Sequence, residues 1–316
     1  MTILSSSSGG PTVYSLLPEN LSALSVPVLY ILLAAASTGW AQDAHAPDNP
    51  YFVTYSHDMT EPGTLELETK TAAARLHGGS PYGALAEEME YGVTPWWTAE
   101  LYLDGQATDD QSALFTGYRF ENRFRPLRHE YVINPVLYIE YESISGADKS
   151  ILEFVGHDGQ SDLSDPNRTA KLDREHEAEF KLILSSNFKS WNLSENFIAE
   201  KDLSHAPWEF GYAVAAARPL HSPTGRVCTF CAEKFIAGAE AYGGVGDTWS
   251  LTLRDTSHYL APVLGWQLPR DMRVSLSPGF GVTRSSLDCA LRIGFAVEFD
   301  HLIERLRASG HGRLVY

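Results

Sequence analysis

The sequence predicts an all-β fold, an antiparallel up-and-down transmembrane β-barrel of about twelve strands. In the segment Ala290–Phe299, apolar Leu291, Ile293 and Phe295 alternate strictly with small or charged residues. Such period-two alternation gives a strand one apolar face and one polar face. The same pattern recurs along most of the chain, behind an N-terminus of signal-peptide character. A barrel with lipid outside and water inside requires this combination.

The N-terminus carries an apolar run of signal-peptide length. Val26–Ala36 is uninterrupted by charge, and small Gly39 and Ala41 precede a cut before Gln42, with a cut after Ala46 as the alternative. Residues 1–25 contain no Lys or Arg, which departs from the usual basic start. The run is too short for a membrane-spanning helix. We expect four regions: residues 1–46, signal peptide and processing region; 47–62, mobile periplasmic leader; 63–299, β-barrel; 300–316, C-terminal tail.

Twelve segments read as strands because each alternates apolar and polar residues between turn signals. They are Thr64–Leu76, Ala84–Gly92, Trp97–Gln106, Ala113–Phe124, Tyr131–Ser143, Glu175–Phe188, Trp191–Asp202, Trp208–Ala217, Cys231–Gly243, Ser257–Leu268, Arg273–Thr283 and Ala290–Phe299. An even number of strands places both ends of the chain in the periplasm if the first strand starts there. Pro135, Pro262 and Pro278 fall inside these strands, where we expect a bulge at each.

Composition and charge narrow the class of protein. Hydrophobic residues make up 44% of the 316-residue chain and the mean hydropathy is −0.19, as in barrels whose strands are half polar. The formal net charge of −16 argues against a nucleic-acid partner, which requires a basic surface.

The alternation sorts the charged residues onto the inner face, since a charge facing lipid is costly. The predicted lumen-lining residues are Glu66, Glu68, Glu88, Glu90, Glu100, Arg119, Glu140, Glu142, Glu177, Glu179, Lys181, Glu240, Arg273, Arg292 and Glu298. Aromatic residues near strand ends are candidates for the membrane interfaces: Trp97, Tyr131, Tyr141, Trp208, Trp266 and Phe299. The acidic surplus favours cations, although a narrow barrel can also fill its lumen with paired charges.

Cys228 and Cys231 form a C-x-x-C pair and are a disulfide candidate in an oxidising compartment. A haem attachment would need His where Ala232 stands, and zinc would need two further ligands. Metal or redox work by the pair stays open as an alternative. We expect no bound metal and no cofactor.

The chain carries no recognisable catalytic motif. G-x-S-x-G, H-E-x-x-H and P-loop patterns are absent from the sequence. His176 and His258 lie beside Glu and Ser residues, but neighbours in a strand point to opposite faces and build no dyad. Asp158, Asp162 and Asp165 could hold Ca²⁺ weakly, but an exposed acidic loop explains them better. We therefore expect no enzyme.

The alternating acidic strands, Ser277–Thr283 (S-P-G-F-G-V-T) and the closing Leu291–Phe299 resemble small Gram-negative outer-membrane β-barrels of the uncharacterised, transporter-like kind. The resemblance covers residues 63–299 and implies contact with outer-membrane lipid. It also implies insertion by the barrel assembly machinery through the final strand, and passage or binding of small molecules.

From these observations we expect a porin-like protein of the Gram-negative outer membrane. Its expected function is that of a small-solute channel or transporter-like barrel with an acidic, cation-favouring lumen. Two alternatives stay open. One is a closed structural or ligand- or metal-binding barrel without transport, and the other is a soluble periplasmic β-protein.

Overall fold

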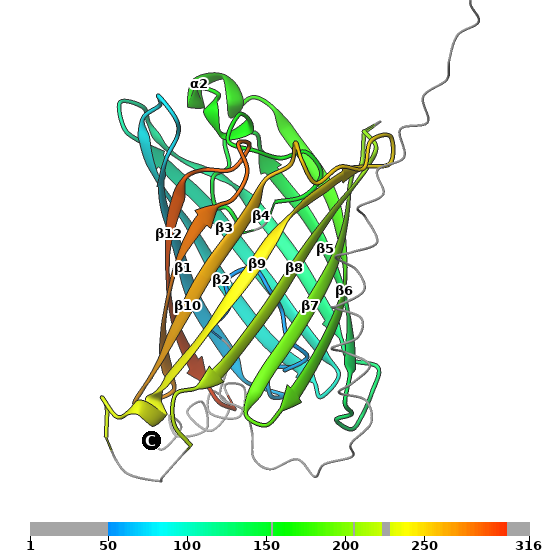
Figure 1. Cartoon of the computed structure of the whole chain (residues 1–316), viewed down its shortest axis with the longest axis vertical. Coiled ribbons are helices and arrows are strands. Elements are labelled where there is room, and N and C mark those ends of the chain that lie inside the picture. Colours follow the sequence, from blue (N-terminus) through cyan, green and yellow to red (C-terminus); the bar gives the residue numbers. More distant parts are fainter. Residues whose placement is uncertain (1–49, 153, 205, 223–227, 302–316) are drawn as a thin grey trace, which may run out of the picture. The chain divides into compact units, whose positions relative to one another are not determined.

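The chain folds into a closed barrel of twelve antiparallel strands, in which β1 pairs with both β2 and β12 (Figure 1). The computed structural model describes residues 50–152, 154–204, 206–222 and 228–301, all within one compact unit. The strands are β1 Leu65–Arg75, β2 Pro81–Thr94, β3 Trp97–Thr108, β4 Ala113–Phe124, β5 Asn134–Ser145, β6 Arg174–Phe188, β7 Trp191–Asp202, β8 Trp208–Pro219, β9 Phe235–Asp247, β10 His258–Leu268, β11 Met272–Gly281 and β12 Cys289–Phe299. The predicted fold class and strand number are confirmed. The expected signal peptide and most of the tail lie outside the described residues.

Four strand boundaries differ from prediction by three or four residues: the starts of β2 and β5 and both ends of β9. β5 begins at Asn134 rather than at Tyr131, because the Asn134 side chain bonds back to the main chain of Tyr131 and holds a turn there (2.7 and 2.8 Å). β9 begins at Phe235 rather than at Cys231, because Ala232–Lys234 forms a 3₁₀ turn, η2.

The expectation of a bulge at each proline is wrong. Pro262 and Pro278 face each other across β10 and β11, where the ladder lapses between Leu260↔Phe280 and Leu264↔Leu276 without a change of register. Two prolines at one rung lack the N–H groups that would bond across it. Pro135 pairs in register with Leu184. The register shifts lie instead at residues 92–94, 104–105 and 210–211.

The outer wall is apolar around the barrel. Its exposed side chains include Leu67, Leu85, Leu103, Phe120, Leu137, Phe180, Leu182, Phe197, Leu260, Leu264, Phe280, Leu291, Ile293 and Phe295. Glu87 departs from the pattern, since it is exposed on β2 and accepts a hydrogen bond from Thr69 (2.8 Å). No helix in the described part of the chain is long and apolar enough to cross a membrane. An apolar wall enclosing buried charges makes the fold an outer-membrane-type β-barrel.

Two segments fill the lumen from opposite ends. Residues 50–60, expected to belong to a mobile leader, instead lie inside the barrel, with Phe52 and Val53 7% and 1% exposed. We call them the plug segment; they enter beside the short turns. At the other end, the β5–β6 connection carries η1 (Asp162–Ser164) and α2 (Asn167–Ala170) and folds inward (Figure 1).

Main-chain contacts hold the β5–β6 connection against β8 and β9. Gly156 donates its N–H to Phe210 O and accepts one from Gly246, each at 3.0 Å. A Cβ on Gly211 would stand 3.1 Å from Phe154 O, so glycine permits this close approach. The apolar Phe154 and Ile151 are buried in the same core as Phe52 and Val53.

Candidate functional site

The predicted lumen-lining residues lie mostly on the inner wall of the barrel. Twelve of the fifteen expose 9% of their surface or less: Glu66, Glu68, Glu88, Glu90, Glu100, Arg119, Glu140, Glu142, Glu179, Lys181, Glu240 and Arg292. Glu177, Arg273 and Glu298 are half-buried. Because the outward neighbours along each strand are exposed, these buried side chains point inward.

Most lumen cations are bound to carboxylates in a network across β1–β6. Lys70 meets Glu88 at 2.5 Å, and Arg273 meets Glu66 at 2.8 Å. Lys181 lies 2.8 Å from Glu179. Lys70–Glu88 joins the neighbouring strands β1 and β2, Arg273 reaches from β11 past β12 to Glu66 on β1, and Lys181–Glu179 lies within β6.

Two arginines of β4 each hold several acids. Arg119 contacts Glu142 at 2.8 Å and Asp104 at 3.0 Å, and Arg123 contacts Glu90 at 2.6 Å. Asp104, Glu121 and Arg123 were missed by the sequence analysis, although Glu121 and Arg123 follow Arg119 at the period-two spacing of the inner face.

The plug segment is held by a carboxylate of β9. Glu240 accepts the backbone N–H groups of Phe52, Val53 and Thr54 at 3.1, 3.0 and 2.8 Å. Three convergent amides form an anion-binding concavity of the kind that stabilises a buried carboxylate. Tyr55 extends the contact to the opposite wall, where its hydroxyl donates to Glu121 (2.9 Å).

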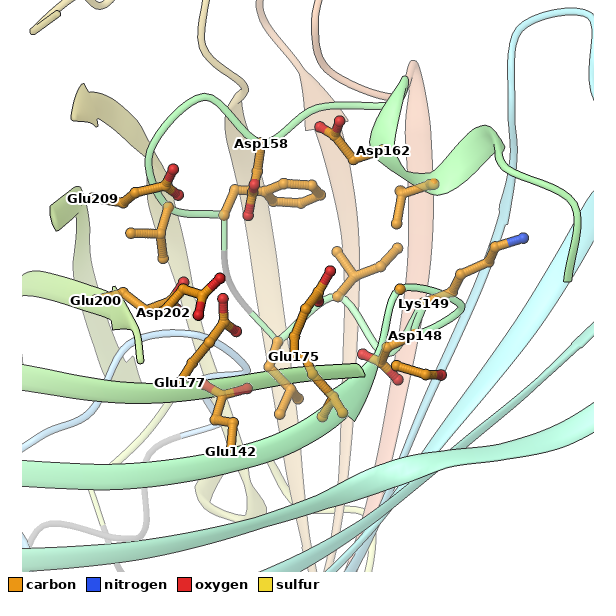
Figure 2. Close-up of a pocket in the computed structure, with 18 of the residues that line it drawn as sticks. Glu142, Asp148, Lys149, Asp158, Asp162, Glu175, Glu177, Glu200, Asp202 and Glu209 are labelled. Atoms are coloured by element: carbon orange, nitrogen blue, oxygen red, sulfur yellow. The ribbon is translucent and has the colours of Figure 1, made fainter. Parts of the chain in front are cut away.

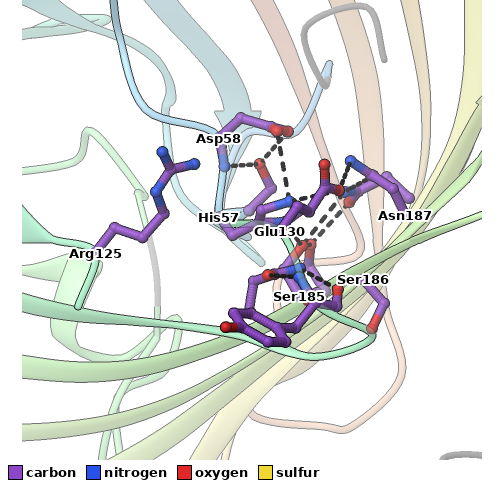
Figure 3. Close-up of polar contacts among 12 residues, drawn as sticks. His57, Asp58, Arg125, Glu130, Ser185, Ser186 and Asn187 are labelled. Carbon is purple, nitrogen blue, oxygen red and sulfur yellow. Dashed lines mark hydrogen bonds and ion pairs between the residues drawn. The ribbon is translucent and has the colours of Figure 1, made fainter. Parts of the chain in front are cut away.

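A second anchor of the plug segment is His57 (Figure 3). Its Nδ1 lies 2.8 Å from Ser185 Oγ and its Nε2 lies 3.2 Å from Glu130 Oε1. A hydroxyl, an imidazole and a carboxylate in this order also occur in hydrolases. Here Ser185 and His57 are 1% and 2% exposed, and Ser185 is also bonded to Ser194 (2.9 Å). The burial of the hydroxyl favours an anchoring role.

The loop end of the lumen holds a cavity of about 370 Å³ between β5–β8 and the β5–β6 connection (Figure 2). Nine carboxylates line it: Glu142, Asp148, Asp158, Asp162, Glu175, Glu177, Glu200, Asp202 and Glu209. The cationic side chains in its lining are Arg119 and Lys149. We call this space the acidic cavity.

Three carboxylates of the acidic cavity converge. Single oxygens of Glu142, Glu177 and Glu200 lie within 4.8 Å of one another, a spacing that fits a shared cation. Glu142 is already bound to Arg119 through one oxygen, whereas its Oε1 is buried without a hydrogen-bond partner among the described residues. The sequence analysis identified Glu142 and Glu177 but not Glu200, which lies on the less regular strand β7.

Asp158 lies in the β5–β6 connection, at the rim of the acidic cavity (Figure 2). Desolvation, together with the charges of Glu209 and Asp162, raises the pKa of Asp158 to about 8. This group therefore gains its charge near pH 8. Asp158, Asp162 and Asp165 are exposed, as expected for an acidic loop; Asp158 and Asp162 also line the cavity, whereas Asp165 does not.

The other predicted residues are placed as follows. A disulfide joins Cys228 and Cys231 in the β8–β9 connection. The aromatic candidates Tyr131, Tyr141, Trp208 and Phe299 are 37–55% exposed, and Trp97 and Trp266 are half-buried. His258 bonds to Tyr212 (3.0 Å) and His176 stacks on Tyr141, so neither makes a dyad with its sequence neighbour.

The protein was compared with protein families, curated proteins and solved structures. No family model matches the chain, and no curated protein matches it. Among solved structures, the chain is similar to the porin NanC (TM-score 0.43, 10% identity, 74% of this chain and 98% of that one). It is also similar to an outer membrane channel from Pseudomonas putida F1 (0.45, 10%, 81% and 100%) and to outer membrane phospholipase A from Escherichia coli (0.38, 10%, 86% and 98%). These similar proteins include a porin, an outer membrane channel and an enzyme, and the closed twelve-strand barrel of this chain rests on its own strand pairing.

Proposed function

We propose that the protein is an outer-membrane channel or transporter-like barrel that admits small cationic solutes and is closed at rest by the plug segment. The barrel lies in the outer membrane of a Gram-negative bacterium, with the β5–β6 connection outside and the first and last strands both joined to periplasmic segments of the chain. The acidic cavity is the observation that carries this proposal. Nine carboxylates against two cations, at the end where solutes would enter, concentrate cations by attraction.

The half-buried carboxylates of the cavity are better suited to this role than the deep ones. Glu177 and Glu200 have no ion-pair or hydrogen-bond partner among the described residues, so their carboxylate oxygens are open to a solute. The Glu66, Glu88 and Glu179 carboxylates are already neutralised by Arg273, Lys70 and Lys181. Selectivity should therefore depend on the loop end of the lumen.

Passage requires the plug segment to move. It bonds to Glu240 on one wall and to Glu121 on the other, so it crosses the lumen in its docked position. A second candidate function follows from this contact, a closed barrel that binds cations at its outer mouth without transport. The two candidates share the acidic cavity and differ in whether ions cross.

Planar-bilayer conductance of the detergent-extracted chain tests the proposal. We expect a current with cation preference, measured as reversal potential in a KCl gradient. Removing one charge about 5 Å from a permeating ion costs about 0.8 kcal/mol in water, or about fourfold in local cation concentration. Glu177→Gln and Glu200→Gln should each lower the cation-to-anion permeability ratio by about this factor.

The matched control is Glu87→Gln, which removes the same charge from the outer wall and should leave the permeability ratio unchanged. An intact barrel, shown by faster gel mobility before boiling, that carries no current would refute passage. Saturable cation binding to that same preparation, weakened by Glu177→Gln, would then support the closed cation-binding barrel.

A further inference from the structure

Two buried cations of the lumen lack a carboxylate, in contrast to their neighbours. Lys70, Arg119, Arg123, Lys181 and Arg273 each form an ion pair with at least one acid. Arg292 and Lys149 are 3% and 2% exposed, and neither forms an ion pair with any described residue. An uncompensated buried charge costs several kcal/mol, so this pair of side chains calls for a counter-ion.

Arg292 on β12 is surrounded by hydroxyl groups rather than acids. Its guanidinium lies over the Tyr242 ring, 4.9 Å from the ring centre, and Ser277 is its direct partner on β11. The Nε and both Nη atoms of Arg292 are buried without a hydrogen-bond partner among the described residues. The same holds for Ser277 Oγ and Tyr82 OH, whereas the Tyr242 hydroxyl lies close enough to interact with Arg292.

Lys149 adds a second positive charge on the other side of Tyr82. Its Nζ lies 5.3 Å from the centre of the Tyr82 ring and donates to Thr108 Oγ1 at 3.1 Å. Burial lowers the pKa of Lys149, as expected for an ammonium group without an acid beside it. Tyr82 is thus contacted by Lys149, which lines the acidic cavity but forms no ion pair with a described residue.

The inner wall around Arg292 is built from small side chains. Ala72 is its partner on β1, and Gly294, Ala290 and Gly279 lie on the same face of β12 and β11. These small residues make room for larger side chains on the inner face, since the Tyr242 hydroxyl oxygen stands 2.9 Å from where a Cβ on Gly279 would lie.

We propose that Arg292, together with Tyr82, Tyr242 and Ser277, binds the carboxylate group of a small organic anion. A guanidinium presents two parallel N–H donors that match a carboxylate, and hydroxyl donors complete its coordination. One bound carboxylate neutralises Arg292 and satisfies polar atoms that are otherwise buried without partners. The site is distinct from the acidic cavity and does not depend on passage through the barrel.

Equilibrium dialysis of the full-length chain in detergent against radiolabelled acetate tests this site. Acetate should replace chloride at constant ionic strength, and about one acetate should bind per chain. Arg292→Met should weaken binding about tenfold or more, since it removes a charge-assisted bidentate contact. Arg273→Met is the matched control, because that arginine is neutralised by Glu66, and acetate binding should persist.

Tyr242→Phe gives an independent variant that keeps the ring beneath the guanidinium and removes its hydroxyl. It should weaken acetate binding less than Arg292→Met does. Thermal unfolding adds a second readout. Acetate should raise the unfolding temperature of the wild-type barrel and should not change that of Arg292→Met. Absence of saturable binding, unchanged binding in Arg292→Met, or equal protection by chloride would each overturn the carboxylate assignment.

Discussion

Glu240→Gln should release the plug segment while leaving the barrel intact. The carboxylate accepts three backbone N–H groups, from Phe52, Val53 and Thr54, and each such bond to a charged group contributes about 1.5–3 kcal/mol. The glutamine side chain keeps one oxygen that can accept a hydrogen bond. Its NH₂ group replaces the other oxygen and cannot accept from the remaining backbone N–H groups. A loss of about 3 kcal/mol, or about a hundredfold in the docking equilibrium, follows.

The plug segment should still dock most of the time in this variant. Phe52 and Val53 remain buried, and burying side chains of this size stabilises by about 1.5–3 kcal/mol each. The expected change is therefore in the population of the undocked state. The number of strands and the mobility of the unboiled protein should not change.

Cysteine labelling measures this population directly. Ser56→Cys places a thiol within the docked plug segment, in a Cys289→Ser background that removes the exposed free cysteine. When redocking is faster than labelling, the reaction rate with a water-soluble maleimide follows the undocked fraction. When Glu240→Gln is added to this parent, the Ser56→Cys thiol should react with maleimide about a hundredfold faster than in the parent.

The control is Glu66→Gln, which removes a lumen carboxylate that pairs with Arg273. It should label at the rate of the parent. Equal rates in Glu240→Gln and the parent, with both barrels intact by gel mobility, would refute the anchoring role of Glu240. Faster labelling together with loss of the unboiled band would show unfolding instead, and Glu240→Asp would then replace Gln.

Three further outcomes follow from the structure. Because the pKa of Asp158 is raised to about 8, its carboxyl is mostly neutral at pH 6 and charged at pH 9; cation preference in bilayers should rise over this interval, and Asp158→Asn should abolish most of the rise. Ser185→Ala removes one bond to the plug segment, worth about 1 kcal/mol, and should speed Ser56→Cys labelling about fivefold; hydrolysis of a lipid ester that disappears in Ser185→Ala would contradict the anchoring role. The Cys228–Cys231 disulfide closes only a short loop outside the strands, so its reduction should cost at most about 2 kcal/mol of stability. The faster-running unboiled band should therefore persist in the presence of reductant.

The strands could be predicted from the sequence because a barrel imposes one rule on every strand. Alternation in β12 and β4 is dictated by lipid on one side and buried polar groups on the other, and both strands end within a residue of prediction. The start of β5 could not be found in this way. It depends on the Asn134 side chain bonding to Tyr131, which is a turn preference that competes with an apolar alternating run.

The interior could be predicted only in part. Glu142 and Glu177 follow from alternation, but their approach to Glu200 depends on the stagger of β5, β6 and β7. The plug segment was missed because residues 50–60 carry no strand pattern. Its position depends on contacts such as Val53 to Glu240, 187 residues apart in the chain. At the other end of the lumen the sequence does carry a signal. The apolar piece Ile151–Val155 stands within a polar connection, and Ile151 and Phe154 are buried where that connection folds inward.

The distribution of charge within the lumen separates the parts of the barrel that can move from those that can select. The network around Arg123 cross-links β2, β3 and β4, and opening it would strand several buried carboxylates at a cost of several kcal/mol each. The plug segment contributes N–H groups, tyrosine and threonine hydroxyls and one imidazole to its contacts, and water can replace each of these when the segment leaves. Gating should therefore follow substitutions at Glu240 and His57, whereas selectivity should follow substitutions at Glu177 and Glu200. A variant such as Glu177→Gln that changed plug labelling but not ion preference would reverse this division.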